Sequence, residues 1–113
     1  ADVTVTKLGT RHLQQLSLEG TAISDVALKT IGQMSNLEEL DLSQTRVTDT
    51  GIANLKGLTE LKVLWLTKTQ VSNVGLQHLR GLKKLELLDL AGTKVTPQAR
   101  QRLEQELPNL ERR

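Results

Sequence analysis

The chain has 113 residues, 15 of them basic and 13 acidic, so a net charge of only +2 gives weak support for a nucleic-acid-binding role. The length allows at most one domain. The chain contains no Cys, which excludes disulfides and cysteine-based metal sites, and no Phe or Tyr, so its core must be aliphatic. No apolar run approaches the roughly 20 residues of a membrane helix, and the first residues lack the pattern of a signal peptide.

Residues 1–12 do not follow the repeat that begins at Leu13 and runs through the rest of the chain. Val3 to Thr6 alternates like a strand, and Gly9-Thr10 is a turn signal. One interpretation is an N-terminal cap that folds back as an antiparallel strand on residues 14–18 and covers the edge of the first repeat. The other is the end of an upstream repeat. The sequence favours neither.

A repeat begins at Leu13. The string L-x-x-L-x-L-x-x-T-x-V, with Ile in place of Val in its first copy, occurs four times, and the copies start 24 residues apart. Apolar residues at helical spacing follow in each of the first three copies. The predicted repeats are residues 13–36, 37–60, 61–84 and 85–109, followed by Leu110 and a tail of residues 111–113.

Each repeat is predicted to start with a short parallel strand, in which Leu16 and Leu18 point inward and the intervening residues point outward. The same position in all four repeats is a threonine, whose hydroxyl can satisfy backbone groups in the turn that leaves the strand. These threonines are Thr21, Thr45, Thr69 and Thr93.

A helix is predicted in the second half of each repeat. Its N-cap positions carry Ser24, Thr48, Ser72 and Thr96, and acidic residues such as Asp25 and Asp49 follow. Gly57 and Gly81 are predicted to end two of these helices. Small residues at the positions of Gly51 and Gly75 indicate close packing between the helices of successive repeats. The last helix is longer, from Pro97 to Leu107, and more polar, as the end of a solenoid requires.

A fixed period of 24 residues with L-x-x-L-x-L is the signature of a leucine-rich repeat. Thr45 to Leu58 reads T-x-V-T-D-x-G-I-x-x-L-x-G-L and closely resembles the bacterial 24-residue variety of that family. The resemblance covers residues 13–110. It implies an α/β solenoid of four repeats, a right-handed superhelix with a parallel sheet on the concave face and helices on the convex face. It also implies a protein-interaction scaffold.

Stacked strands place outward side chains in columns about 4.8 Å apart. One column reads Ser17, Asp41, Trp65, Asp89, the next reads Gln15, Glu39, Val63, Leu87, and a third reads Glu19, Ser43, Thr67, Ala91. An outward Trp beside Val and Leu, rimmed by carboxylates, is typical of a binding hot spot. The predicted partner-binding residues are Trp65, Asp41, Asp89, Val63, Leu87, Glu39 and Thr67.

The expected partner is a protein or peptide. The alternative is an architectural segment of a larger protein, or self-association through the Trp65 face. Asp41 and Asp89 would lie roughly 9–10 Å apart with no sugar cleft around them, so catalysis is not expected. His12 and His78 lack partners for a metal site, and no cofactor is implied. The basic residues lie off the strands and the only aromatic is flanked by acid, so neither a nucleic acid nor a membrane is expected as a partner. The sequence does not indicate a compartment.

Overall fold

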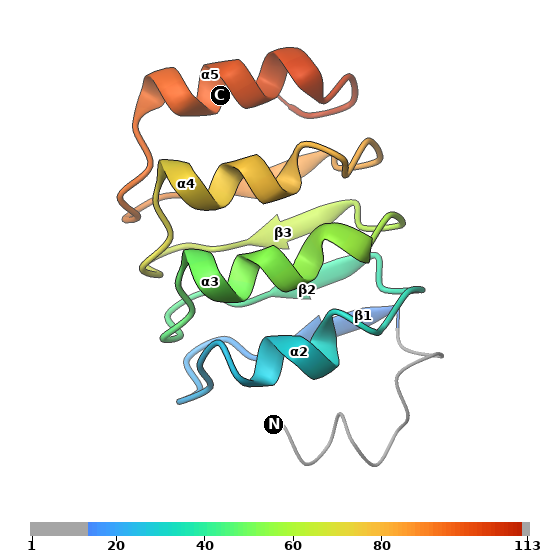
Figure 1. Ribbon diagram of the computed structural model, residues 1–113, viewed down its shortest axis with the longest axis vertical. Coiled ribbons are helices and arrows are strands. Elements are labelled where there is room, and N and C mark those ends of the chain that lie inside the picture. The colour runs from blue at the N-terminus through green and yellow to red at the C-terminus, as the bar shows by residue number, and fades with distance from the viewer. Residues whose placement is uncertain (1–13, 112–113) are drawn as a thin grey trace.

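A computed structural model describes residues 14–111 of the chain. One parallel sheet runs through it with the strands in sequence order, and each strand is the first element of one repeat (Figure 1). The strands are β1 (Gln15–Ser17), β2 (Glu39–Asp41), β3 (Val63–Trp65) and β4 (Leu87–Asp89). The order β1-β2-β3-β4 confirms the predicted stack of four in-register repeats.

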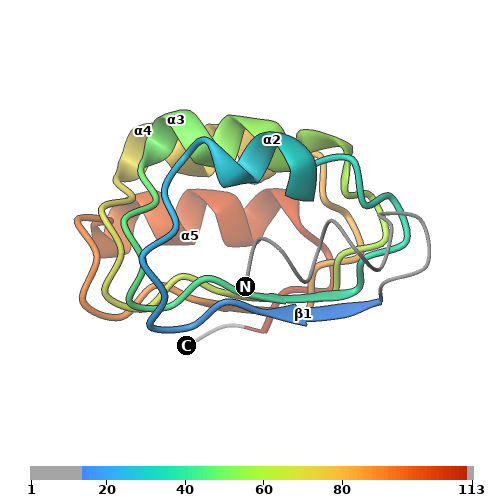
Figure 2. The same cartoon turned by 90° about the horizontal axis from the view of Figure 1, so that it is seen from below.

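The helices form a second layer that covers one face of the sheet (Figure 2). Two of them tighten into a 3₁₀ turn before they end, whereas the last is a regular α-helix of 10 residues. They are α2 (Ala27–Ile31), α3 (Asp49–Ile52) with η1 (Ala53–Gly57), α4 (Asn73–Leu76) with η2 (Gln77–Leu79), and α5 (Pro97–Glu106).

The core between the two layers is aliphatic, as the composition requires. Leu40, Leu64 and Leu88 are fully buried at the centres of their strands, while the residues on either side of each are only partly buried. This pattern follows from the alternation of side chains along a strand. Leucine and isoleucine from the helices close the core from the other side. In β1, by contrast, Leu16 is only partly buried.

The threonine column has the structural role that the sequence predicts. The hydroxyls of Thr21, Thr45, Thr69 and Thr93 each donate to the carbonyl oxygen three residues earlier, at 2.6–2.8 Å. Each hydroxyl therefore holds the turn that leaves its strand. Thr45 and Thr69 are buried, and their hydroxyls have the hydrogen bond that a buried polar group needs.

A second set of hydrogen bonds, which we call the inter-repeat ladder, joins each repeat to the next. Its acceptors are Asp25, Asp49 and Asn73. Each takes the backbone N–H of the residue 23 positions later, at 2.8, 2.7 and 2.9 Å respectively. Each also forms a side-chain hydrogen bond with the hydroxyl of that residue, and the three partners are Thr48, Ser72 and Thr96.

Only two of the four predicted N-cap residues cap a helix with their side chains. Thr48 and Thr96 do cap their helices, accepting from Thr50 N–H and Ala99 N–H. The Ser72 hydroxyl makes no cap bond and donates to Asp49 instead. The prediction for Ser24 is wrong, because α2 begins at Ala27 and its N-cap is Val26.

The glycines divide into two kinds. Gly51 requires a small residue, as predicted, but the reason is the ladder: a Cβ added there would lie 2.9 Å from Asp25 Cγ. Gly57 ends η1 and Gly81 lies two residues beyond η2, but neither has a positive φ. Gly20 and Gly92, in the strand-exit turns, do have a positive φ, and at the same position the two middle repeats carry Gln44 and Lys68, also with a positive φ. The predicted N-terminal segment, residues 1–12, lies outside the described residues, as do two residues of the predicted tail, 112 and 113.

Candidate partner-binding face

The candidate site is built on the outer face of the sheet, opposite the helices. The strand register pairs Asp41 with Trp65 and Trp65 with Asp89, so the single tryptophan lies between two aspartates on neighbouring strands. The same register pairs Val63 with Glu39 and with Leu87. The two columns predicted from the sequence are therefore adjacent on this face.

Burial agrees with the outward orientation of these side chains. Leu64 and Leu66 on either side of Trp65 are fully buried, whereas Trp65 itself is only partly buried. The other six predicted site residues are also partly buried: Asp41, Asp89, Val63, Leu87, Glu39 and Thr67. None of the seven belongs to the fully buried core. Six of them lie on the strands, and Thr67 lies on the turn that follows β3.

The two aspartates have a structural role that the sequence did not reveal. The Oδ1 atom of Asp41 accepts the N–H of Ser43 at 2.9 Å, and that of Asp89 accepts the N–H of Ala91 at 3.0 Å. An Asp side chain that binds the backbone two residues ahead stabilises a turn. These carboxylates therefore hold the turns that follow β2 and β4.

Trp65 differs from both of its neighbours in the column. It occupies the position at which the flanking repeats place the turn-holding Asp41 and Asp89, and an indole cannot accept a backbone N–H as a carboxylate does. The third repeat therefore lacks this turn contact. In its place it presents a large apolar ring with Val63 and Leu87 in the adjacent column.

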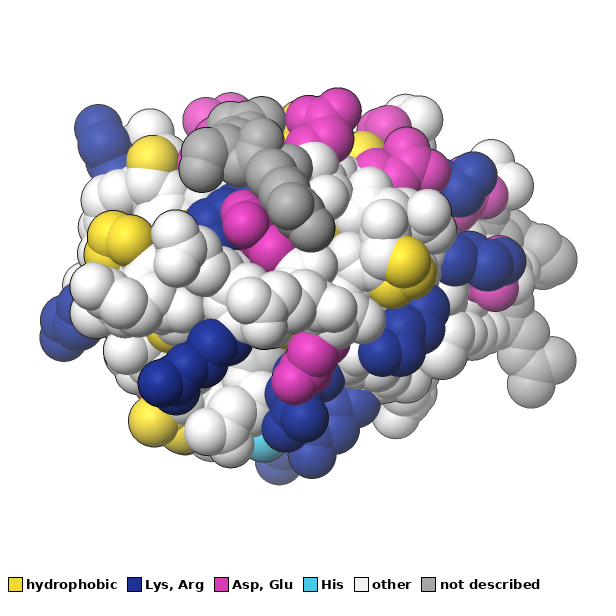
Figure 3. Space-filling view, turned by 90° about the horizontal axis from the view of Figure 1, so that it is seen from above, with side chains coloured by type: hydrophobic (Ala, Val, Ile, Leu, Met, Phe, Trp, Pro, Cys, Tyr) yellow, Lys and Arg dark blue, Asp and Glu magenta, His cyan; other side chains and the backbone are white. Residues whose placement is uncertain are grey.

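Charge is distributed unevenly around the repeats. The outward strand positions carry Glu39, Asp41 and Asp89 and no Lys or Arg. Figure 3 looks onto the α5 end and shows Asp and Glu side chains gathered along the strand side, with Lys and Arg mostly over the helix side and the flanks. The surface around Trp65 is thus acidic and apolar.

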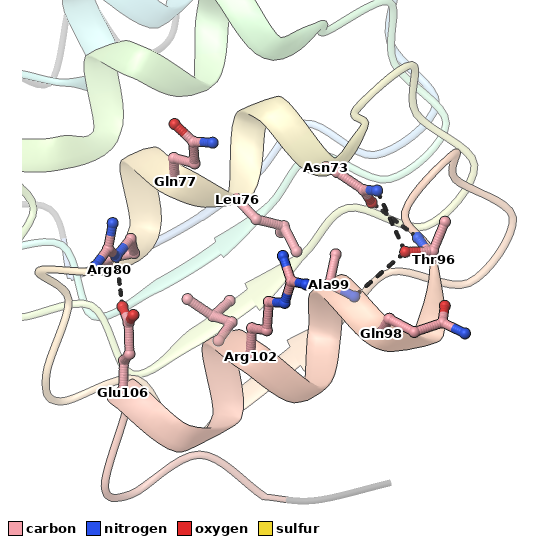
Figure 4. Close-up of a pocket in the computed structure, with 10 residues that line it drawn as sticks. Asn73, Leu76, Gln77, Arg80, Thr96, Gln98, Ala99, Arg102 and Glu106 are labelled. Atoms are coloured by element: carbon pink, nitrogen blue, oxygen red, sulfur yellow. Dashed lines mark hydrogen bonds and ion pairs between the residues drawn. The ribbon is translucent and has the colours of Figure 1, made fainter.

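The helix side has a separate groove between α4 and α5, with a volume of about 450 Å³. Leu76, Ala99 and Leu103 line its apolar part (Figure 4). Arg80 pairs with Glu106 across one end, and the last step of the inter-repeat ladder crosses the other. The groove contains none of the predicted site residues.

Among residues 14–111, no three His, Asp or Glu side chains are grouped so that they could hold a metal ion. In the same part of the chain, no helix has both the length and the apolar character that crossing a membrane requires.

Comparisons with known proteins identify the repeat. A family model described as leucine rich repeat matches residues 35–95. Among solved structures, internalin C2 of Listeria monocytogenes has a TM-score of 0.74 and 33% identity over 87% of this chain. A leucine-rich repeat protein of Leptospira interrogans has a TM-score of 0.71 and 30% identity over 96% of the chain. No curated protein sequence matches.

This chain spans only part of those two proteins, 39% of the internalin and 26% of the Leptospira protein. The Chaetomium Mex67:Mtr2 structure, with a TM-score of 0.70 and 17% identity over 96% of this chain and 84% of the matched chain, shows the fold alone. The family match, together with the four stacked repeats and their threonine column, supports one assignment. The chain belongs to the leucine-rich repeat family.

Proposed function

We propose that this chain is a module that binds a protein or peptide partner through the outer face of its sheet, with Trp65 as the anchor. Leucine-rich repeat domains are generally protein-interaction modules and are typically not enzymes. The proposal for this chain is more specific, because it names the face and the central residue.

The main observation behind the proposal is that Trp65 occupies a position at which both neighbouring repeats carry a turn-stabilising Asp. Asp41 and Asp89 hold their turns, and Trp65 stands in the same column without doing so. A residue that gives up a stabilising contact and leaves an indole partly exposed is better explained by recognition than by folding. Trp is also enriched among the residues that dominate binding free energy.

The partner's chemistry follows from the same face. Val63 and Leu87 extend the apolar surface beside Trp65, and Glu39 adds a carboxylate next to Val63. A protein segment with an apolar side chain flanked by Lys or Arg fits this arrangement. A nucleic acid does not, because its phosphates would be repelled by the carboxylates and the face offers only one aromatic platform.

The test is the variant Trp65→Asn, because an Asn side chain can hold the turn as Asp does in the neighbouring repeats. The matched control is Val74→Asn, which removes an apolar side chain, 60% exposed, from α4 on the helix side. Immobilised wild type and both variants are incubated with a bacterial lysate, and circular dichroism verifies that each is folded. We expect a protein that wild type and V74N retain and W65N does not.

The retained protein would then be titrated against each variant. Loss of an anchor residue costs about 2 kcal/mol or more, so W65N should raise Kd by roughly 30-fold. Equal recovery of the same proteins by wild type and W65N would contradict the proposal.

The second candidate function is architectural, either as a segment of a larger repeat protein or through self-association on the Trp65 face. The observation that favours it is the chain's partial coverage of the internalin and Leptospira structures. Trp65 fluorescence separates this candidate from the first. Acrylamide quenching that falls as protein concentration rises, together with a solution mass above that of the monomer, would indicate that a second copy covers the face.

A further inference from the structure

The last repeat carries an arginine at a position where the other repeats carry aliphatic residues. Arg100 lies 24, 48 and 72 residues after Leu76, Ile52 and Leu28, and those three side chains are at most 4% exposed. An arginine in a core column needs compensating contacts, because burial of an unpaired charge is strongly unfavourable.

The guanidinium of Arg100 has those contacts. Its Nε donates to Glu104 Oε2 at 3.0 Å, its Nη1 donates to the carbonyl oxygen of Leu88 at 2.6 Å, and its Nη2 reaches the carbonyl oxygen of Glu111 at 3.3 Å. The Arg100 and Glu104 side chains are only 14% and 9% exposed. The pair is therefore held in place rather than free in solvent.

The Leu88 carbonyl is on the outer edge of the sheet. β4 pairs with β3 through the residues on either side of Leu88, so the backbone groups of Leu88 itself face away from β3. In each inner strand the equivalent groups face the following strand. At β4 the guanidinium supplies the donor that a following strand would supply.

Among residues 14–111, the last backbone hydrogen bond to this edge comes from Glu111. Glu111 N–H donates to Glu86 O at 2.8 Å, as Leu87 N–H donates to Lys62 O one strand earlier. The next outward acceptor along the edge is Leu88 O, which accepts from the Arg100 side chain. A recess of about 360 Å³ beside it exposes parts of Leu90 and Val95, whose counterparts in the third repeat, Leu66 and Val71, are fully buried.

We propose that Arg100, held by Glu104, is a plug that closes the β4 edge against the addition of another β-strand from a second copy of the chain. An unpaired strand edge is a template for association, and native proteins block such edges with charged side chains or covering segments. Arg suits this role because its planar fork can donate to several acceptors at once. The partly exposed Leu90 and Val95 make the block necessary, since an open edge beside apolar surface favours pairing between copies.

The test replaces the plug with the residue type that the other helices carry. In Arg100→Leu the edge carbonyl of Leu88 loses its donor and the apolar recess grows. The matched control is Arg102→Leu, which removes the same charge and adds the same side chain on α5, but in the groove against α4 (Figure 4). Light scattering after size exclusion, over a range of protein concentrations, measures the mass.

We expect the mass of R100L to rise toward twice the monomer value as concentration increases, while wild type and R102L keep the mass they have at low concentration. An R100L mass that does not differ from that of R102L across the range would overturn the proposal.

A second measurement uses the unmodified protein and therefore does not depend on whether R100L folds. In an NMR exchange experiment the Nε–H of a seated Arg100 should exchange with water at least about tenfold more slowly than that of Arg102, because it is hydrogen-bonded and buried. Equal exchange rates for the two side chains would show that Arg100 is not seated at the edge, and would overturn the proposal independently.

Discussion

At the scale of single residues, short polar side chains hold this fold together by binding backbone groups. Each threonine of the repeat donates within its own repeat, to a carbonyl three residues earlier. Each member of the inter-repeat ladder accepts from the following repeat. The first kind of contact shapes a turn and the second fixes the position of one repeat on the next. Asn73 performs the second role without a charge, which shows that the geometry of the hydrogen bonds is sufficient for it.

Asp49 tests that conclusion. In Asp49→Ala the N–H and hydroxyl of Ser72 both lose their partner, and we expect a loss of about 1–3 kcal/mol in the free energy of unfolding. Asp49→Asn should lose less than half as much, because an amide can make both contacts as Asn73 does with Thr96. Urea unfolding followed by circular dichroism measures both variants. Equal losses would mean that the carboxylate acts through its charge rather than through these bonds.

At the scale of elements, the helices are kept in register by what faces them from the preceding repeat. Gly51 and Gly75 are buried in α3 and α4, and the side chains nearest to an added Cβ would be Asp25 and Asp49 respectively. The glycine therefore makes room for the ladder. At Gly57, on the surface of η1, nothing lies within 4 Å of an added Cβ.

These two glycines predict opposite effects of the same substitution. Gly57→Ala should be neutral or stabilising by up to about 1 kcal/mol, because alanine is the better helix former. Gly51→Ala should destabilise by about 1–3 kcal/mol, because it displaces the Asp25 carboxylate from its two bonds with Thr48. The double variant Asp25→Ala, Gly51→Ala checks the cause. Once the Asp25 carboxylate is absent, the second change should cost clearly less, because only the backbone Cα of residue 25, at 3.2 Å, stays close to the added Cβ. Additive losses in this cycle would place the strain elsewhere.

The sequence predicts the strands, their order and the outward columns, because alternation is local and the repeat multiplies the signal four times. It does not predict the ladder, because the partner of Asp25 is 23 residues away, and a Ser or Thr followed by an acidic residue also fits a local helix cap. Ser24 shows the difference. It belongs to the first repeat, where no described residue supplies a carboxylate to hold it, and α2 starts later than the pattern suggests.

The same limit applies to the candidate site. The position of Trp65 between Asp41 and Asp89 follows directly from the 24-residue period, and the strand register confirms it. The turn contacts of the two aspartates do not follow from the period, because they depend on which rotamer each carboxylate adopts. These contacts change the interpretation of Trp65, because both of its neighbours in the column stabilise the turns that follow their strands.

At the scale of the whole molecule, stability is shared between neighbouring repeats, so a repeat with one neighbour is held less firmly than a repeat with two. The two end strands of the described chain differ in how well the leucine at their centre is covered. At the β4 end, α5 and the Arg100 side chain cover the last strand, and Leu88 is fully buried. At the β1 end, Leu16 in the same column is only partly buried.

Truncation of the same residue type along this one column measures the difference. Leu64→Ala and Leu88→Ala should each lower the free energy of unfolding by about 2–5 kcal/mol, because both leave a cavity in a closed core. Leu16→Ala should lower it by at least about 1 kcal/mol less, because its side chain already contacts solvent and the first repeat can open without the others. Urea unfolding of the three variants gives the comparison, and hydrogen exchange should show faster opening at Leu18 N–H than at Leu42 N–H or Leu66 N–H. A loss for Leu16→Ala equal to that of the other two would show that the repeats unfold as one closed unit whose first strand is as tightly held as its last.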